Sequence, residues 1–195
     1  MSRPRVGVVA LQGGVREHID LLASLDAVPV ELRRPADLVG ADGQRVDAVV
    51  LPGGESSTID RLLRMFGLGD PLRDAIAAGL PTLGTCAGLI QLATRIEDPA
   101  PGQACFGVLD VTVRRNAFGR QIDSAEMGLD TAWGRTQVAF IRAPEVVSYG
   151  PGVTVVATVH ERVVAVAQGS ITGIAFHPEL TGETLFHRRL LDAIG

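Results

Sequence analysis

The chain of 195 residues lacks lysine entirely, so all 18 of its basic side chains are arginines, set against 22 acidic side chains. The resulting net charge of -4 at pH 7 is mild. A protein whose main partner is a nucleic acid or an anionic membrane needs basic patches, and the sequence shows none. We therefore expect neither nucleic acid nor membrane as a partner.

Cysteine is scarce, with only Cys86 and Cys105 in the chain. The apolar run after the basic start, residues 6–11, is shorter than the core of a secretory signal and ends in glycines. No apolar run approaches the roughly 20 residues that a membrane span requires. We expect free thiols in a cytoplasmic protein.

Patterns for binding metals or nucleotides are missing too. The four histidines and two cysteines show no spacing typical of metal ligands. The glycine-rich segments have neither the Gly-Lys-Ser/Thr ending of a phosphate loop nor a G-x-G-x-x-G pattern. We expect no metal ion and no other cofactor.

The first half of the chain alternates between apolar runs and helical patterns. Continuous apolar runs at 6–11 and 48–51 are typical of parallel strands buried on both faces, and a short strand is expected at 28–32. Apolar spacing and capping residues predict helices at 16–25, at about 58–66 and from Pro71 to Leu80. This pattern favours a parallel sheet covered by helices.

The second half changes in character, because its strands follow one another without helices between them. After a surface loop at 97–103, strands are expected at 108–113, 138–141, 153–159, 163–167 and 171–176. Such a series predicts a mixed or antiparallel extension of the sheet. A helix at 183–194 should end the chain, and we expect one domain over residues 1–195.

Residues 84–88, Gly-Thr-Cys-Ala-Gly, follow a short apolar strand and precede a helical pattern. They are typical of a nucleophile elbow, a strained turn where small neighbours avoid collision with the adjacent strand and helix. A helix N-terminus also favours the reactive thiolate form of Cys86. The alternative is a buried structural cysteine beside a glycine cap.

His177 and Glu179 follow the last predicted strand and are separated by a proline. Positions i and i+2 of an extended segment point to the same side, and proline favours an extended backbone in the residue before it. His177 can then act as a base that Glu179 orients, if the sheet brings Cys86 to the same edge. The histidines His160 and His187 are interpreted as solvated or capping residues.

Residues 52–58, Pro-Gly-Gly-Glu-Ser-Ser-Thr, form a glycine loop after a predicted strand. Backbone N–H groups of such a loop can stabilise an oxyanion together with the N–H of Ala87, the residue after the elbow cysteine. The alternative is a tight turn in which Ser56 or Ser57 caps the next helix. Both interpretations can hold at once.

Three motifs, Pro-Gly-Gly-Glu-Ser, Gly-Thr-Cys-Ala-Gly-Leu and Phe-His-Pro-Glu-Leu, together resemble the class I, or triad-type, glutamine amidotransferases. The segments at 11–18, 115–121 and 140–144 resemble one branch of that family, the glutaminase subunits of pyridoxal 5'-phosphate synthase. The resemblance covers nearly the whole chain. It implies a three-layer α/β sandwich with a mostly parallel central sheet flanked by helices and a mixed or antiparallel extension.

The resemblance also implies hydrolysis of L-glutamine to L-glutamate and ammonia. The ammonia would pass to a separate synthase subunit that makes pyridoxal 5'-phosphate from a pentose phosphate and a triose phosphate. Carried over by motif position, Cys86 is the nucleophile, His177 the general base and acid, and Glu179 its orienting carboxylate. The implied oxyanion donors are the backbone N–H groups of Gly54 and Ala87.

For the substrate, the resemblance implies contacts from Gly54, Glu55, Ser56, Arg115, Ile141 and Arg142. An arginine suits the α-carboxylate of glutamine, and the sequence leaves open whether Arg115 or Arg142 supplies it. The same resemblance implies an interface with the synthase subunit at Gln12, Gly13, Arg16, Glu17 and His18.

Two other functions stay open at this point. Hydrolases and chaperones with a related elbow cysteine act on other acyl groups or on aldehydes, but such proteins generally lack a His-Pro-Glu segment near the C-terminus. A regulatory subunit that only binds its synthase would have no use for Cys86, His177 and Glu179 together.

Overall fold

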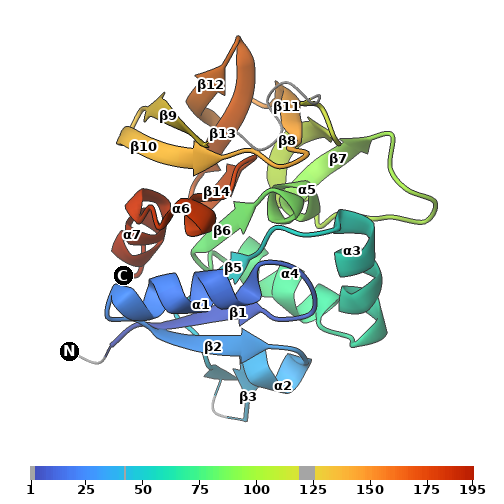
Figure 1. Ribbon diagram of the computed structural model, residues 1–195. Helices are drawn as coiled ribbons and strands as arrows, with labels where there is room; N and C mark the ends of the chain where they lie inside the picture. Colours follow the sequence, from blue (N-terminus) through green and yellow to red (C-terminus); the bar gives the residue numbers. More distant parts are fainter. Residues whose placement is uncertain (1–2, 42, 119–125) are drawn as a thin grey trace.

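The computed structural model describes residues 3–41, 43–118 and 126–195, and the last three residues of the motif at 115–121 lie outside these ranges. Within them, one ten-stranded sheet dominates the structure. Helices flank the part of the sheet built by the first half of the chain, and mostly strands build the other part (Figure 1). The predicted α/β fold with a mixed extension is confirmed.

Five parallel strands form the first part of the sheet. In order across it they are β2 (Val28–Leu32), β1 (Arg5–Val9), β5 (Ala48–Leu51), β6 (Thr82–Thr85) and β14 (Ile171–Ile174). Every residue of β5 and β6 is buried, as expected for strands covered by helices on both faces. Because β6 pairs in parallel with both β5 and β14, the carboxyl ends of these three strands meet at one edge.

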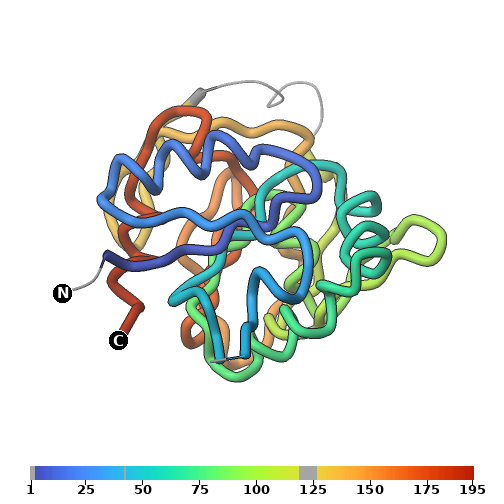
Figure 2. Tube along the Cα trace, turned by 90° about the horizontal axis from the view of Figure 1, so that it is seen from below, coloured from blue at the N-terminus to red at the C-terminus, as the bar shows by residue number. Residues whose placement is uncertain are grey.

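The helices lie on both sides of these strands. They are α1 (Val15–Ser24), α2 (Pro35–Leu38), α3 (Ser56–Met65), α4 (Gly69–Ala77), α5 (Ala87–Leu92), α6 (Pro178–Thr181) and α7 (Leu185–Asp192). Figure 2 shows α1 and α4 on opposite sides of β1 and β2. Helix α1 contacts α6, and α3 contacts α4 and α5. None of the described helices is long and apolar enough to cross a membrane.

The second part of the sheet is mostly antiparallel. Beyond β14 it continues with β13 (Arg162–Gln168), β11 (Glu145–Tyr149), β8 (Leu109–Arg114) and β7 (Ala93–Glu97), while β12 (Thr154–Val159) pairs with β13. Two hairpins are separate from it, β9 (Glu126–Thr131) with β10 (Gly134–Ala139) and β3 (Val39–Gly40) with β4 (Gly43–Gln44). An isolated bridge between Ala139 and His177 joins β10 to the segment between β14 and α6.

Several boundaries differ from the prediction. Strands β7, β9 and β11 were not expected, and the predicted terminal helix at 183–194 is shorter, covering Leu185–Asp192, with α6 as a separate turn before it. Helix α3 begins at Ser56, two residues before its predicted start. Its cap is the Glu55 side chain, so the prediction of a serine cap is wrong; the carboxylate accepts from two backbone N–H groups where a serine hydroxyl could reach only one.

Candidate active site

Cys86 occupies the turn between β6 and α5 in a strained backbone conformation, with φ 48° and ψ -100°. A positive φ is rare for a residue with a side chain and persists only where the surroundings impose it. Here the Cys86 N–H donates to the Ile174 carbonyl at 2.7 Å. A Cβ on Gly84 or Gly88 would collide with neighbouring backbone, so both glycines are required by close approach. The turn has the geometry of a nucleophile elbow.

His177 lies three residues beyond the end of β14, the strand next to the elbow strand, and is the N-cap of α6. Its backbone N–H donates to the Ala139 carbonyl at 2.9 Å, which ties the residue to β10. Its Nδ1 lies 2.7 Å from Glu179 Oε1, and both residues are buried. Glu179 stands in the first turn of α6 and not in an extended segment, so the expected pairing occurs through a helix start.

The other partner of His177 is the sulfur of Cys86. Burial by itself lowers the pKa of the His177 ring, but hydrogen bonds to the Cys86 sulfur and the Glu179 carboxylate outweigh it and raise the pKa to about 10. His177 therefore carries a proton at neutral pH and stands between the Cys86 sulfur and the Glu179 carboxylate. Gly53 lies against both residues, since a Cβ on it would meet the His177 ring and lie 3.3 Å from Cys86 Cβ.

The glycine loop is held by the segment that precedes α1. The Gly14 N–H donates to the Gly53 carbonyl at 3.0 Å, and the Glu55 N–H donates to Gln12 Oε1 at 2.8 Å. In a trans peptide the N–H points opposite to the C=O, so the Gly54 N–H points away from Gly14. The conformation of this loop therefore depends on residues 12–14.

A pocket of ≈ 340 Å³ opens in front of these residues, within the usual range for small-molecule sites. All six predicted substrate residues line it, together with the triad candidates, namely Gly54, Glu55, Ser56, Arg115, Ile141, Arg142, Cys86, His177 and Glu179. Arg142 has a φ of 42° at the rim. Sequence reasoning missed Ile90, Asn116 and Leu180, although the last two adjoin predicted site residues in the chain.

Arg115 and Glu55 pair with each other at 3.2 Å inside this pocket. The Glu55 carboxylate also accepts from the N–H and hydroxyl groups of Ser57 and Thr58 at the start of α3. Burial raises the pKa of Glu55, but these hydrogen bonds outweigh it and lower the pKa to about 2. Glu55 is therefore a fixed anion beside the guanidinium.

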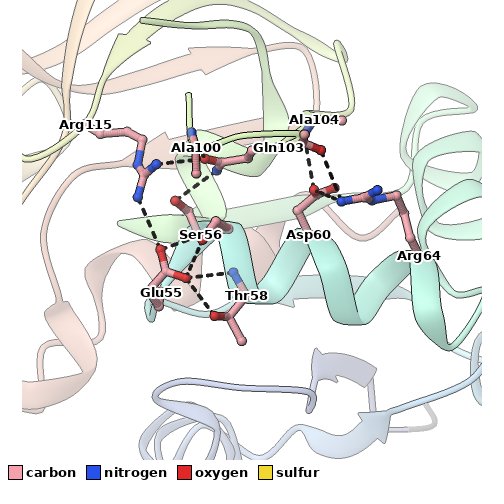
Figure 3. Close-up of polar contacts among 11 residues, drawn as sticks. Glu55, Ser56, Thr58, Asp60, Arg64, Ala100, Gln103, Ala104 and Arg115 are labelled. Atoms are coloured by element: carbon pink, nitrogen blue, oxygen red, sulfur yellow. Dashed lines mark hydrogen bonds and ion pairs between the residues drawn. The ribbon is translucent and has the colours of Figure 1, made fainter. Parts of the chain in front are cut away.

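Gln103 was expected only as part of a surface loop, yet it holds two of the pocket residues (Figure 3). Its Oε1 accepts from Arg115 Nη1 at 2.9 Å, and its Nε2 donates to Ser56 Oγ at 3.0 Å. No motif in the sequence marks this residue. Its role depends on the fold, because the loop between β7 and β8 must return to helix α3 before Gln103 reaches Arg115.

The residues predicted to face a synthase subunit divide into two groups. Gly13, Arg16 and Glu17 are exposed, and Gln12 is half-buried over the glycine loop. His18 is fully buried, so its side chain does not lie on that surface. His187 is also fully buried and bonded to His18, which makes its interpretation as a solvated or capping residue wrong. His18 reaches Thr85 at the end of β6, and α7, which carries His187, also contacts β6.

Among the described residues, no three His, Cys, Asp or Glu side chains are placed to hold a metal ion. The fold and the site together define an α/β protein with a cysteine, a histidine and a glutamate gathered at the carboxyl ends of neighbouring parallel strands. The chain belongs to the SNO glutamine amidotransferase family, whose model matches residues 8–194.

Two relatives are similar over nearly their whole length. A Frankia alni protein described as pyridoxal 5'-phosphate synthase subunit PdxT is 52% identical over 197 residues, covering 100% of this chain and 96% of that protein. An Acidothermus cellulolyticus protein of the same description is 54% identical over 198 residues, covering 95% of this chain and 91% of its own length.

Solved structures agree with this assignment. A crystal structure of a glutamine amidotransferase matches with a TM-score of 0.88 at 42% identity, covering 97% of this chain and 98% of the other. A putative GMP synthase subunit of Thermoplasma acidophilum matches with a TM-score of 0.67 at 17% identity, covering 99% of this chain and 95% of the other, which shows a shared fold alone.

Proposed function

We propose that this chain hydrolyses L-glutamine to L-glutamate and ammonia, and supplies the ammonia to the synthase subunit of a pyridoxal 5'-phosphate synthase. The observation that carries the proposal is the position of His177, which lies beside Cys86 across Gly53 and 2.7 Å from Glu179 Oε1, with all three residues lining one pocket. Nucleophile, base and orienting carboxylate in this order are the arrangement needed for covalent acyl transfer. The family and the relatives' descriptions support the substrate and the pathway.

In the first half of the reaction, the Cys86 thiolate attacks the side-chain amide carbon of glutamine. The negative charge moves to the amide oxygen, which the Ala87 and Gly54 N–H groups stabilise. The Ala87 N–H is free of helical partners because Ala87 is the first residue of α5. His177 then gives its proton to the departing nitrogen, the C–N bond breaks, and ammonia leaves a thioester on Cys86.

In the second half, neutral His177 takes a proton from a water molecule as that water attacks the thioester. A second oxyanion forms in the same place and collapses, which releases glutamate and returns the thiolate and the protonated histidine. Glu179 accepts the Nδ1–H of His177 throughout, so the other ring nitrogen stays directed at the reacting atoms.

The substrate fits the charges around the pocket. Arg115 and Arg142 offer two guanidinium groups for the α-carboxylate of glutamine, and Glu55 offers an anion for its α-ammonium group. Arg115 is held in place by Glu55 and Gln103, so little side-chain entropy remains to be lost when a carboxylate binds.

The partner surface that we propose includes the exposed residues Gly13, Arg16 and Glu17. The same segment holds the glycine loop through Gln12 and Gly14. A synthase subunit seated there would therefore act on the loop that carries the Gly54 oxyanion donor. Loss of one such donor typically raises the barrier by about 3–4 kcal/mol, so docking could change the rate strongly.

Ammonia release from glutamine, measured with and without the synthase subunit, tests the proposal. We expect the wild-type chain to release ammonia in the complex and Cys86→Ala to release none. Cys105→Ala is the matched control, because that half-buried thiol lies outside the pocket and its pKa is raised by burial and by Asp60. Full activity of Cys86→Ala would remove Cys86 from its role.

A glutamine analogue that carries an electrophile separates this function from the alternatives. We expect a mass increase on the peptide that contains Cys86, and protection of that peptide by added glutamine. A hydrolase for another acyl group or a purely regulatory subunit would show no protection by glutamine. Labelling of Cys105 instead of Cys86 would also contradict the proposal.

A further inference from the structure

A pair of buried histidines lies behind Glu179, outside the pocket. His18 from α1 and His187 from α7 are both fully buried, with His18 Nδ1 2.8 Å from His187 Nε2. The other ring nitrogen of His18, Nε2, lies 3.2 Å from Thr85 Oγ1 and 3.6 Å from Glu179 Oε1. Neither histidine lines the pocket, so neither can touch the substrate in this structure.

Both rings are neutral near pH 7. Burial lowers the pKa of His187 to about 4. Burial, reinforced by His187 and His177, also lowers the pKa of His18 well below its usual value. A neutral imidazole has one N–H donor and one acceptor nitrogen, so the pair contains two protons whose positions can be argued from their surroundings.

In the hydrogen bond between the two rings, either His18 Nδ1 or His187 Nε2 can be the donor, and the other nitrogen of His187 decides which one it is. Its Nδ1 is buried and has no hydrogen-bond partner among the described residues. If His18 Nδ1 donated to His187 Nε2, the proton of His187 would sit on its Nδ1 as an unpaired buried N–H, which is costly. His18 Nε2 would then direct a lone pair toward the Glu179 carboxylate, which would be repulsive. If His187 Nε2 donates to His18, the unpaired Nδ1 holds only a lone pair. The second arrangement is therefore favoured.

This arrangement places a proton on His18 Nε2, directed at Thr85 and Glu179. Glu179 Oε1, the oxygen nearest to this proton, receives one short hydrogen bond from His177 and has lone-pair capacity for a second. At 3.6 Å the His18 Nε2 to Glu179 Oε1 contact is longer than a hydrogen bond. Contacts of this kind in substrate-free enzymes often shorten when the reaction complex forms.

We propose that His18 is a positioning residue of the glutaminase reaction: its Nε2–H, oriented by His187, holds the Glu179 carboxylate against His177. The inference rests on the proposed function, because a firmly held Glu179 carboxylate is needed only if His177 acts as acid and base for Cys86. His18 and His187 thus extend the catalytic arrangement from the pocket through α1 to the C-terminal helix.

Two amide variants of His18 test the proposal. In His18→Gln the side-chain amide reaches about as far as Nε2 and can still donate to Glu179. In His18→Asn the amide reaches only as far as Nδ1, so the contact with His187 can remain while the contact with Glu179 is lost. The exposed His160 supplies the matched control, His160→Asn.

Glutaminase kinetics of the complex with the synthase subunit give the readout. We expect His18→Asn to lower kcat by about 10–100-fold, as for other groups that orient a catalytic or metal-binding histidine, with the KM for glutamine unchanged. The basic limb of the pH–rate profile should move to lower pH, because a poorly held Glu179 stabilises protonated His177 less. His18→Gln and His160→Asn should keep both the wild-type kcat and the wild-type limb.

The titratable groups near His18 are His177, Glu179 and His187, and those beside His177 are Cys86 and Glu179. His187→Leu is a further test, because it releases the proton of His18 to move to Nδ1 and should lower kcat in the same way. Equal kcat values and pH limbs in His18→Gln and His18→Asn would overturn the proposal. A wild-type complex that releases no ammonia would instead overturn the proposed function itself.

Discussion

Gly53 is closely surrounded by the catalytic residues that we propose. It stands between the elbow and the end of β14, where a methyl group would collide with the His177 ring and lie 3.3 Å from Cys86 Cβ. The positions of the strained Cys86 backbone and of the His177 ring therefore depend on close contact with the backbone of Gly53, as well as on their own hydrogen bonds. A small change at residue 53 should displace the catalytic atoms without disturbing the core.

We predict that Gly53→Ala lowers kcat for glutamine about 100-fold, the usual loss when a catalytic group moves by about 1 Å. Thermal unfolding should stay close to wild type, because the methyl group pushes on one ring at a pocket wall. The control is Gly152→Ala, whose methyl group would have its nearest neighbour at 3.8 Å. Wild-type kcat in Gly53→Ala would show that His177 does not need its observed position.

At the scale of elements, the loop between β7 and β8 is joined to helix α3 at three points, at Gln103, at Ala104 and at Gly102, whose carbonyl accepts from Arg64 Nη2 at 3.2 Å (Figure 3). Gln103 donates to Ser56, and the Ala104 N–H donates to Asp60 at 3.2 Å, where Arg64 also binds at 2.7 Å. The first of these points continues to Arg115. The loop therefore supports the side of the pocket that contains Arg115, whereas α6 and β10 support the side that contains His177.

We predict that Gln103→Ala raises the KM for glutamine about tenfold and changes kcat little. A hydrogen bond to a charged group contributes about 1.5–3 kcal/mol, and part of this is lost when Arg115 must be ordered by the substrate instead. Steady-state kinetics measure the two constants separately. Gln44→Ala, in the β3–β4 hairpin, is the matched control, and an unchanged KM in Gln103→Ala would contradict the role of Gln103.

The sequence predicted the elements that have strong local patterns. The parallel strands and the elbow follow from apolar runs and from the glycines that flank Cys86. Strand β11 was missed because its only strong apolar residues are two adjacent valines, and its pairing depends on distant partners in β8 and β13. Gln103 and His187 were misjudged because each acquires its partner only when separate elements pack together.

For the whole molecule, the important feature is that β14 is parallel to β6 but antiparallel to β13. The change of direction lets the chain return from the extension and still deliver His177 to the edge where Cys86 stands. The chain then continues into α6 and α7, so that His187 meets His18 from the first helix. The two ends of the chain are therefore joined through a buried pair of neutral histidines.

This pair makes the stability of the whole fold depend on pH. The pKa of His187 is about 4 in the folded state, below its ordinary value, and that of His18 is lowered as well. Between pH 4 and about 6.5 the unfolded chain therefore binds more protons than the folded one. The contribution of this pair to stability is complete above about pH 6.5 and is lost as the pH falls toward 4.

We predict that the free energy of unfolding falls by about 2 kcal/mol between pH 7 and pH 5 through His187 alone, since one pKa unit corresponds to about 1.4 kcal/mol. Denaturant titrations at about pH 5, 6 and 7 measure this, above the range where Glu55 contributes. His187→Leu should be less stable at pH 7, because His18 loses a partner, but its stability should depend less on pH. His160→Leu should keep the wild-type slope, and the same slope in His187→Leu would show that this buried pair does not stay neutral in the folded protein.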